Sequence, residues 1–441
     1  GSLVNYGYVC YGVVSGTTIT WGTPVAFHSQ TMSTRPMDVR FDPNNTAYFA
    51  LAFADNESTW SDIAGCMMGT VTTGGVFGAW GSQKVGQTSY TTNGYVAHNQ
   101  ISFDPNTANQ FAFCSAYSSS NICAVWICTY DSSSMVITMS SNNNPVASQN
   151  ANHAGVVWNP HVANELICHY HYGSSPYYGR LRRGTVSGSS GSQTISYGTE
   201  VVITSTNVDW CDFTFDPNTA GSFVVAWTNS NVGPDAESKA GTLSGDTWTL
   251  GSIVKPPDPG SAGTIEVEFD PNQAGKLLFL YRSSVNSYKP RIATGTVSGT
   301  TVTYSDDSTV ITSEATENAS GGGTRLKFFP DSKGKFVTTY LLGDGATNEY
   351  DIGAKIGQTT ATITTLTAAN FLGIADEAIA DTATGSISIK GGLATVGLSG
   401  LTPGTDYYTQ GDSTINTTST SPAIKLGKAL SATAIDLEYR S

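Results

Sequence analysis

Four of the six histidines of this chain lie in one short stretch: His153, His161, His169 and His171. Two imidazoles separated by one residue share a face of a β-strand, and imidazole is a common zinc ligand. No cysteine or carboxylate accompanies them at a spacing typical of metal sites, and Tyr170 and Tyr172 alternate with them along a ring-rich segment. The sequence therefore favours packed rings over a metal site, and we expect no bound metal.

An aspartate that recurs beside a proline is the next candidate for chemistry. Its copies are Phe41-Asp42-Pro43, Phe103-Asp104-Pro105, Trp158-Asn159-Pro160, Phe215-Asp216-Pro217, Phe269-Asp270-Pro271 and, without the acidic residue, Phe328-Phe329-Pro330. An aspartate repeated in one local pattern beside a turn proline caps its own turn by accepting backbone hydrogen bonds. We therefore assign this aspartate a structural role and predict no catalytic residue in the chain.

The remaining charged residues form no recognisable catalytic motif. Asp55-Asn56-Glu57 and Asp344-Gly345 carry the oxygen ligands that calcium prefers, so calcium is kept as an alternative, although neither segment is a complete calcium loop. No nucleophile elbow, phosphate-binding loop or dinucleotide fingerprint is present. Arginine is scarce, so a cluster that grips an anionic sugar is not predicted. We expect a protein that acts without catalysis and without a cofactor.

The proline pattern marks a repeat that must position these residues. The six prolines are separated by 62, 55, 57, 54 and 59 residues. An alternating segment precedes each proline turn and an apolar segment follows it, which predicts a hairpin. A second hairpin follows in several copies around a Gly-Thr-x-Ser-Gly turn, as in Gly184–Gly188, Gly241–Gly245 and Gly295–Gly299. Four strands per repeat are typical of propeller blades, so we predict an all-β fold and a β-propeller.

The six repeats are compatible with two blade counts. A surplus hairpin, Tyr6–Val14 with Thr18–Val25, precedes the first proline turn. It either completes the sixth blade or pairs with residues 371–389 to make a seventh. We favour six blades and keep seven as the alternative.

Composition and charge exclude several classes of partner. The chain of 441 residues has a net charge of −13 and only 21 Lys and Arg, without a basic stripe, which argues against nucleic acid. No apolar run is long enough to span a membrane, and membrane insertion is not expected. The seven cysteines lie mostly within apolar segments and are expected as buried thiols, with a Cys114–Cys123 bridge as an alternative.

The two faces of the predicted propeller differ. We call the side with the proline and Gly-Thr-x-Ser-Gly turns the turn face, and the side with the loops between strands 2 and 3 and the connections between blades the variable face. The second differs from copy to copy and carries aromatic rings beside polar groups, which suits sugars. The predicted ligand-binding residues are Trp60, Tyr117, Tyr172, Tyr177, Tyr178, Trp210, Asp235, Tyr288, Asp344 and Tyr350.

The pattern changes near residue 368, which predicts a propeller over 1–368 and a small C-terminal β domain over 369–441. The second part contains Asn370-Phe371 with Gly373 and Ala375, Gly400–Gly404 with Tyr407-Tyr408, and Gly427 with Ala429 and Leu430–Thr433. With these residues and the Gly-Thr-Val-Ser-Gly turns, nearly the whole chain resembles tail-fibre-type virion proteins of bacteriophages. The regular Phe-Asp-Pro-Asn turn and the second repeat, which lacks the Gly-Thr-x-Ser-Gly turn, depart from the usual family pattern.

That resemblance implies a part of the virion, assembled in the host cytoplasm, that contacts the host surface. It implies binding of a host surface receptor, for which the variable face favours a glycan, and assembly with other virion proteins and with further copies of the chain. The family provides no general catalytic residues. Two alternatives stay open: a polysaccharide-degrading hydrolase or lyase, which would need facing carboxylates, and a purely structural scaffold.

Overall fold

The computed structural model describes residues 7–28, 37–58, 61–72, 74–86, 96–117, 122–145, 151–172, 177–231, 235–283, 289–311, 325–343, 350–359, 374–375, 387–388, 392–395, 398–410, 415–418 and 423–437. Every regular element in this part of the chain is a β-strand. It includes no helix that is long and apolar enough to cross a membrane.

Two compact units make up the chain: residues 1–358 and residues 359–441. The boundary expected at residue 368 therefore falls inside the second unit. The small unit contains one five-stranded sheet, formed by β31 (Leu393–Ala394), β35 (Ala434–Leu437), β34 (Ala423–Ser431), β32 (Asp406–Gln410) and β33 (Ile415–Asn416). Leu426 and Ile435 are fully buried in its core. This sheet is what the alternating runs and Gly/Pro turns of the segment predict.

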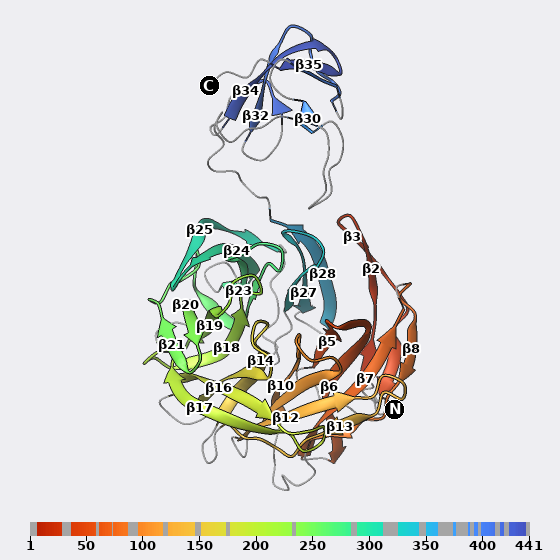
Figure 1. The fold of residues 1–441 in the computed structure, drawn as a ribbon, viewed down its shortest axis with the longest axis vertical. Coiled ribbons are helices and arrows are strands. Elements are labelled where there is room, and N and C mark those ends of the chain that lie inside the picture. Colours follow the sequence, from red (N-terminus) through yellow and green to blue (C-terminus); the bar gives the residue numbers. More distant parts are fainter. Residues whose placement is uncertain are drawn as a thin grey trace. The chain divides into compact units, whose positions relative to one another are not determined.

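The large unit is a β-propeller built on the six proline turns, as the repeat predicts (Figure 1). The first blade contains β5 (Asp38–Asp42), β6 (Asn45–Ser58), β7 (Ser61–Val71), β8 (Phe77–Trp80) and β9 (Lys84–Val85). The second contains β10 (Val96–Phe103), β11 (Gln110–Tyr117), β12 (Ile122–Tyr130) and β13 (Ile137–Met139). The third contains β14 (Ala151–Trp158), β15 (Glu165–Tyr172), β16 (Gly179–Ser187) and β17 (Thr194–Val202).

The remaining blades follow the same antiparallel order. The fourth contains β18 (Val208–Phe215), β19 (Ser222–Asn229), β20 (Asp235–Ser244) and β21 (Thr247–Leu250). The fifth contains β22 (Ser261–Phe269), β23 (Lys276–Ser283), β24 (Lys289–Ser298) and β25 (Thr301–Val310). The sixth contains the described strands β26 (Arg325–Phe328), β27 (Lys335–Gly343) and β28 (Tyr350–Gln358).

The surplus hairpin lies between the sixth and first blades. It consists of β1 (Gly7–Val9) and β2 (Gly12–Ser15), which pair with β4 (Val25–His28) and β3 (Thr18–Trp21). Strand β3 lies next to β28, and Phe27 contacts the ring of Phe53 in the first blade with centroids 5.5 Å apart (Figure 1). The alternative partner, residues 371–389, lies largely outside the described residues, and its described strands β29 (Ile374–Ala375) and β30 (Ile387–Ser388) pair with each other.

Strand alternation builds the core between neighbouring blades. In β6, Ala50, Ala52 and Ala54 face the second blade, whereas Phe49 and Phe53 face the surplus hairpin. The second strand of a blade is thus buried on both faces and reads as a continuous apolar run. Replacing a buried phenylalanine such as Phe49 or Phe53 with alanine typically lowers the free energy of unfolding by about 3–5 kcal/mol.

The Gly-Thr-x-Ser-Gly turn owes its two glycines to different constraints. A Cβ at Gly241 would lie 2.4 Å from the ring of Phe223 on the neighbouring strand, so only glycine leaves room for that ring to lie over position 241. Gly245 has a φ of +58° with open space around it, so its constraint is the backbone conformation. The first glycine of the turn therefore allows an aromatic ring to approach the backbone, and the last glycine allows a left-handed backbone conformation.

Hydrogen bonds from the proline turns join neighbouring blades; we call these bonds the clasps. The Oδ1 atom of Asp216 accepts a hydrogen bond from the backbone N of Asn218 at 2.9 Å, which caps the turn as expected. Its Oδ2 atom accepts from the backbone N of Gly275 in the fifth blade at 2.8 Å, and Asn218 donates through Nδ2 to the carbonyl of Asp270 at 3.0 Å. Asn44 and Asn106 make the corresponding amide bonds. The Phe-Asp-Pro-Asn pattern therefore joins blades as well as turning the chain.

The described cysteines are free thiols, and all but Cys10 and Cys211 are buried. The Sγ atoms of Cys114 and Cys123 lie 3.6 Å apart, well beyond the length of a disulfide bond of about 2.05 Å. The alternative of a bridge between them is therefore not realised, and both act as small buried apolar side chains.

Candidate functional site

Side chains of the first strands line a central channel. A hollow of about 620 Å³ is bordered by residues of all six blades. Two positions of each first strand face it. The position nearer the variable face is held by Asp38, Gln100, Gly155, Asp212, Glu266 and Arg325, and the position nearer the turn face by Arg40, Ser102, Val157, Thr214, Glu268 and Lys327. Residues two apart on a strand share a face, which explains this double ring.

The ring nearer the variable face also ties neighbouring blades together. Asp38 accepts a hydrogen bond from the backbone N of Ile101 at 2.9 Å. Gln100, Asp212 and Glu266 do the same for the backbone of Val156, Val267 and Leu326, at 2.7, 2.8 and 2.6 Å. Burial raises the pKa of Asp212 to about 6 and that of Glu266 to about 7. The two carboxyl groups therefore lose their protons at a higher pH, closer to neutrality, than free carboxyl groups do.

The third blade breaks the ring. It has Gly155 where the other blades have a long or polar side chain, and His169 of β15 fills the space, with its Nε2 atom 2.2 Å from where a Cβ of Gly155 would lie. His169 is 1% exposed, and burial lowers its pKa to about 4, so the ring is neutral. Neither of its ring nitrogens has a hydrogen-bond partner among the described residues. A small cavity of about 40 Å³ beside His169 is also lined by Trp210.

Two β-bulges position the residues around this gap. The register shifts between Asn152 and Gly155 in β14, and between Asp209 and Cys211 in β18. His153 and Trp210 occupy equivalent places in these bulges and have positive φ angles of 46° and 34°. A bulge re-aims a side chain that regular pairing would direct elsewhere, and such conformations concentrate at functional sites. The His153 and Trp210 rings meet at 4.4 Å between centroids.

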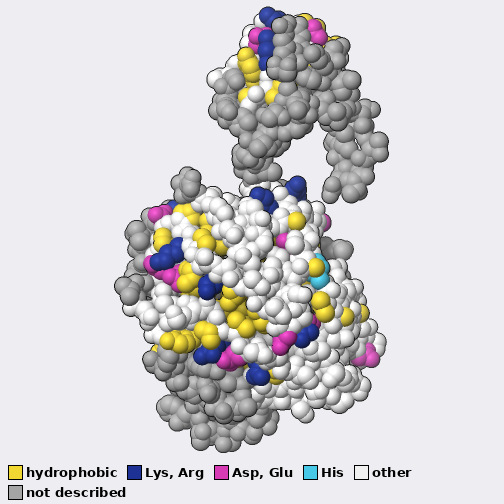
Figure 2. Space-filling view, turned by 60° about the vertical axis from the view of Figure 1, so that its left-hand side comes forward, with side chains coloured by type: hydrophobic (Ala, Val, Ile, Leu, Met, Phe, Trp, Pro, Cys, Tyr) yellow, Lys and Arg dark blue, Asp and Glu magenta, His cyan; other side chains and the backbone are white. Residues whose placement is uncertain are grey.

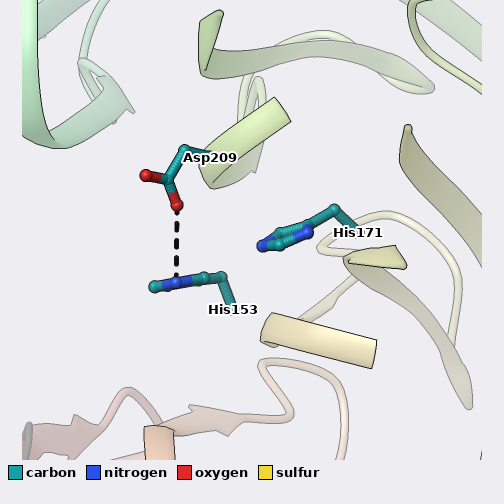
Figure 3. Close-up of side chains that lie close together, drawn as sticks. All are labelled: His153, His171 and Asp209. Atoms are coloured by element: carbon teal, nitrogen blue, oxygen red, sulfur yellow. Dashed lines mark ion pairs between the residues drawn. The ribbon is translucent and has the colours of Figure 1, made fainter. Parts of the chain in front are cut away.

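His171 and Asp209 complete a cluster with His153 (Figure 3). The Nε2 atom of His153 lies 3.5 Å from Oδ1 of Asp209, and the two imidazole rings stack with centroids 5.2 Å apart. His171 is buried, whereas the Asp209 side chain is 48% exposed. One nitrogen from each histidine and one carboxylate oxygen lie within 4.8 Å of one another, so the cluster could hold a metal ion.

Tyr177 borders the same cluster. Its ring stands nearly perpendicular to that of His171, with centroids 6.2 Å apart, and the residue is 38% exposed. Asn207 fixes its backbone, because Oδ1 of Asn207 accepts a hydrogen bond from the N of Tyr177 at 3.2 Å. Asn207 directly precedes β18, so residues of both the third and the fourth blade position the Tyr177 ring.

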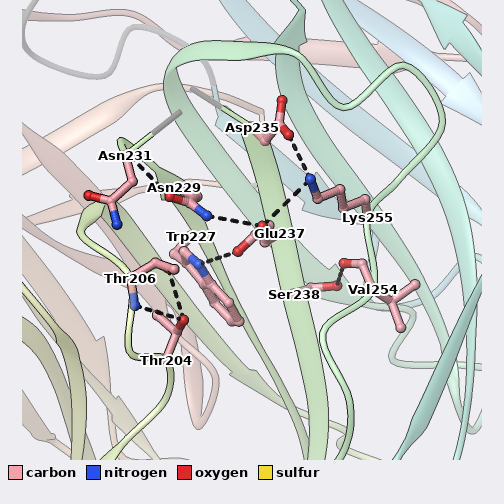
Figure 4. A network of polar contacts seen from close by, with 10 residues as sticks. All are labelled: Thr204, Thr206, Trp227, Asn229, Asn231, Asp235, Glu237, Ser238, Val254 and Lys255. Atoms are coloured by element: carbon pink, nitrogen blue, oxygen red, sulfur yellow. Dashed lines mark hydrogen bonds and ion pairs between the residues drawn. The ribbon is translucent and has the colours of Figure 1, made fainter. Parts of the chain in front are cut away.

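A second polar network lies within the fourth blade (Figure 4). Glu237 accepts hydrogen bonds from Nε1 of Trp227 at 3.0 Å and from Nδ2 of Asn229 at 3.2 Å. Lys255 pairs with Asp235 at 2.6 Å. Trp227 and Glu237 are buried and fix the strand ends, whereas the side chains of Asp235 and Lys255 are partly exposed.

Replacing Glu237 with alanine is expected to lower the free energy of unfolding by about 3 kcal/mol, because it leaves the indole N–H of Trp227 buried without an acceptor. Replacing Asp235 with alanine removes an exposed ion pair and is expected to cost less than about 1 kcal/mol. Urea unfolding of the two variants measures the difference. Equal losses would contradict the assignment of the buried carboxylate as the centre of the network.

The residues predicted to bind a ligand have different positions. Trp60, Tyr288 and Asp344 lie outside the described residues, and for Tyr117, Tyr172 and Tyr350 only the backbone, at a strand end, is described. Trp210 and Tyr177 come together around His153 and His171, and Tyr178, next in the chain to Tyr177, is half-buried. Asp235 belongs to the separate network of the fourth blade. The sequence did not predict the convergence of His153, His171 and Asp209, although an alignment of the repeats marks Gly155 as an exception.

Charges on the surface are mixed in sign. Figure 2 shows basic side chains next to acidic ones on the propeller face in view, without a broad patch of either sign.

No protein-family model matches the chain. No curated protein sequence matches it significantly either. Among solved structures, it is similar to the BP39L lectin from Burkholderia pseudomallei, with a TM-score of 0.54, 9% sequence identity, and coverage of 80% of this chain and 89% of the lectin. It also matches an α-L-arabinofuranosidase from Fusarium graminearum with a TM-score of 0.45, 10% identity, and coverage of 74% and 92%. At such identities the likeness to the lectin concerns the fold: the chain is a β-propeller.

Proposed function

We propose that this chain is a tail-fibre protein of a phage virion whose propeller binds a host-surface glycan without catalysis. The observation that carries the proposal is the juxtaposition of the Trp210 and Tyr177 rings with carboxylate and imidazole groups at the variable face. Flat rings stack on the apolar face of a sugar, and fixed polar groups select its hydroxyls. The similarity to the lectin is compatible with this reading, because it places a sugar-binding protein on the same fold.

The virion context rests on the resemblance of the repeats and of the C-terminal segment to phage tail fibres. In that context the small C-terminal unit attaches the propeller to other virion proteins or to further copies of the chain. The mixed surface charge fits a binding surface that selects by hydrogen bonds and ring stacking instead of by net charge.

A glycan array and host-cell binding test the proposal. The purified chain should bind a defined set of glycans, and replacing Trp210 with alanine should weaken that binding about tenfold or more, as loss of a central aromatic contact does. The matched control is Trp21→Ala, because Trp21 is exposed by 52% on the surplus hairpin, away from the cluster. Blank arrays together with absent cell binding, or equal losses in both variants, would remove the support for the proposal.

A polysaccharide-degrading activity is a second candidate, favoured by the raised pKa values of Asp212 and Glu266 beside the channel. A carboxyl group that is protonated near pH 7 can serve as a general acid, and a second carboxylate can act opposite it. Release of reducing ends from host polysaccharide, abolished by Glu266→Gln, would establish this alternative in place of simple binding.

A further inference from the structure

We propose that His153, His171 and Asp209 form a binding site for a divalent transition-metal ion of the zinc type. The site belongs to the interface of two blades, because β14 and β15 of the third blade supply the imidazoles and β18 of the fourth supplies the carboxylate (Figure 3). From the spacing of the histidines in the sequence we expected no bound metal, and the present proposal replaces that expectation. It does not depend on the glycan-binding function proposed above.

The distances between the ligand atoms are close to those of an occupied site. Bonds of 2.0–2.1 Å in a tetrahedral zinc site place neighbouring ligand atoms about 3.3 Å apart. Nε2 of His153 and Oδ1 of Asp209 already lie 3.5 Å apart, and all three ligand atoms lie within 4.8 Å of one another. Binding of one ion requires the side chains to move so that the three ligand atoms lie about 3.3 Å from one another.

The chemistry of the ligands selects the class of metal. Two imidazoles and one carboxylate suit zinc, nickel, copper or iron, whereas calcium and magnesium prefer sites made of oxygen atoms. The calcium alternative drawn from the acidic loops therefore does not apply to this cluster.

The fold prepares the cluster for a ligand. The positive φ of His153 and the bulge that contains Asp209 and Trp210 direct the three groups to one point. His171 is buried against the Tyr177 ring, whereas Asp209 is half-exposed, so an ion can enter from the solvent side. Three protein ligands leave a fourth position open to water or to an oxygen of a bound molecule, as in sites that exchange ligands.

Metal binding also has a structural consequence. An ion held by residues of two blades would cross-link the third and fourth blades in the folded chain only. Mass action then predicts a higher melting temperature in the presence of the metal.

The test uses the full chain after treatment with a chelator. Titration with zinc chloride in a calorimeter should show one equivalent bound per chain with a micromolar or lower Kd, and cobalt(II) should give the intense visible bands of a tetrahedral site. His171→Ala and Asp209→Asn should each weaken zinc binding by about 100-fold, equivalent to the loss of about 2.7 kcal/mol.

The matched control is His161→Ala, because His161 is exposed in a proline turn on the turn face and contacts the carbonyl of Asp216 instead of the cluster. It should bind zinc as the original chain does. Lack of saturable zinc binding by the original chain would overturn the proposal. Zinc binding by the His171 and Asp209 variants as tight as that of the original chain would also overturn it, as would loss of zinc binding in the His161 variant alone. Circular dichroism and the melting temperature of each metal-free variant separate a misfolded chain from one that has lost the ligand. Glycan binding is measured separately, so either proposal can fail without the other.

Discussion

Replacing Asp216 with alanine is expected to lower the free energy of unfolding by about 4 kcal/mol, because two backbone N–H groups lose a charged acceptor. These are the N–H of Asn218 in the same turn and the N–H of Gly275 in the fifth blade. Asp216 is 1% exposed, so water cannot readily replace the carboxylate at either donor. Chemical unfolding with urea, followed by tryptophan fluorescence, measures the loss.

Asp131 provides the matched control for this prediction. Its Oδ1 atom also caps a turn, accepting hydrogen bonds from the backbone N of Ser133 and Ser134 at 2.8 and 3.0 Å, but no described contact joins its carboxylate to another blade. Asp131→Ala should therefore destabilise the chain much less than Asp216→Ala. Equal losses would mean that local capping alone explains the recurrent aspartate, and that the contact between blades adds nothing.

The second large effect concerns pH. The folded chain should lose stability as the pH rises from 5 to 8, because burial raises the pKa of Glu266 from 4.5 to about 7. A carboxyl group with a raised folded-state pKa binds more protons when folded than when unfolded over this range. Stability therefore falls with increasing pH up to the folded pKa. The shift of Glu266 corresponds to about 3 kcal/mol at pH 8.

Glu266→Gln isolates this contribution. Glutamine at the equivalent position of the second blade, Gln100, accepts a backbone hydrogen bond at 2.7 Å, so the substitution should preserve the bond to the N–H of Leu326. The variant should match the original chain at pH 5 and exceed its stability at pH 8 by up to about 3 kcal/mol. Unfolding curves at the two pH values measure this. A variant with an unchanged pH dependence would show that Glu266 is ionised in the folded protein throughout the range.

The sequence predicted the propeller because its signals are local and repeated. The proline turn and the two glycines of the Gly-Thr-x-Ser-Gly turn answer to local constraints within a hairpin: Gly241 leaves room for the ring of Phe223, and Gly245 adopts a positive φ. Their spacing alone therefore locates four strands per repeat. The role of the Phe-Asp-Pro aspartate as a turn cap followed from the same reasoning, whereas its bond to the next blade did not, because that contact spans 59 residues.

The metal-binding cluster could not be predicted in this way. His153 and Asp209 are 56 residues apart, and they meet only because two bulges occur at equivalent places in adjacent blades. Nothing in the local residue pattern specifies a bulge with a positive φ at His153. Aligning the repeats by strand position shows that the third blade has Gly155 where the other blades have a side chain that lines the channel. His169 is the residue that pairs with Gly155 on the next strand. Predicting the cavity also required knowing that these strands surround a channel.

Among the described residues, the clasps made by the Asp and Asn side chains of the proline turns reach the blade that follows in the chain. Asn44 reaches the second blade, Asn218 and Asp216 reach the fifth, and Asp270 reaches Gly334 in the sixth. During synthesis on a ribosome, each finished blade therefore already carries the side chains that receive the blade emerging after it. The surplus hairpin and its neighbour β28 lie at the two ends of the propeller segment, so the contact that closes the ring can form only after the sixth blade has been synthesised.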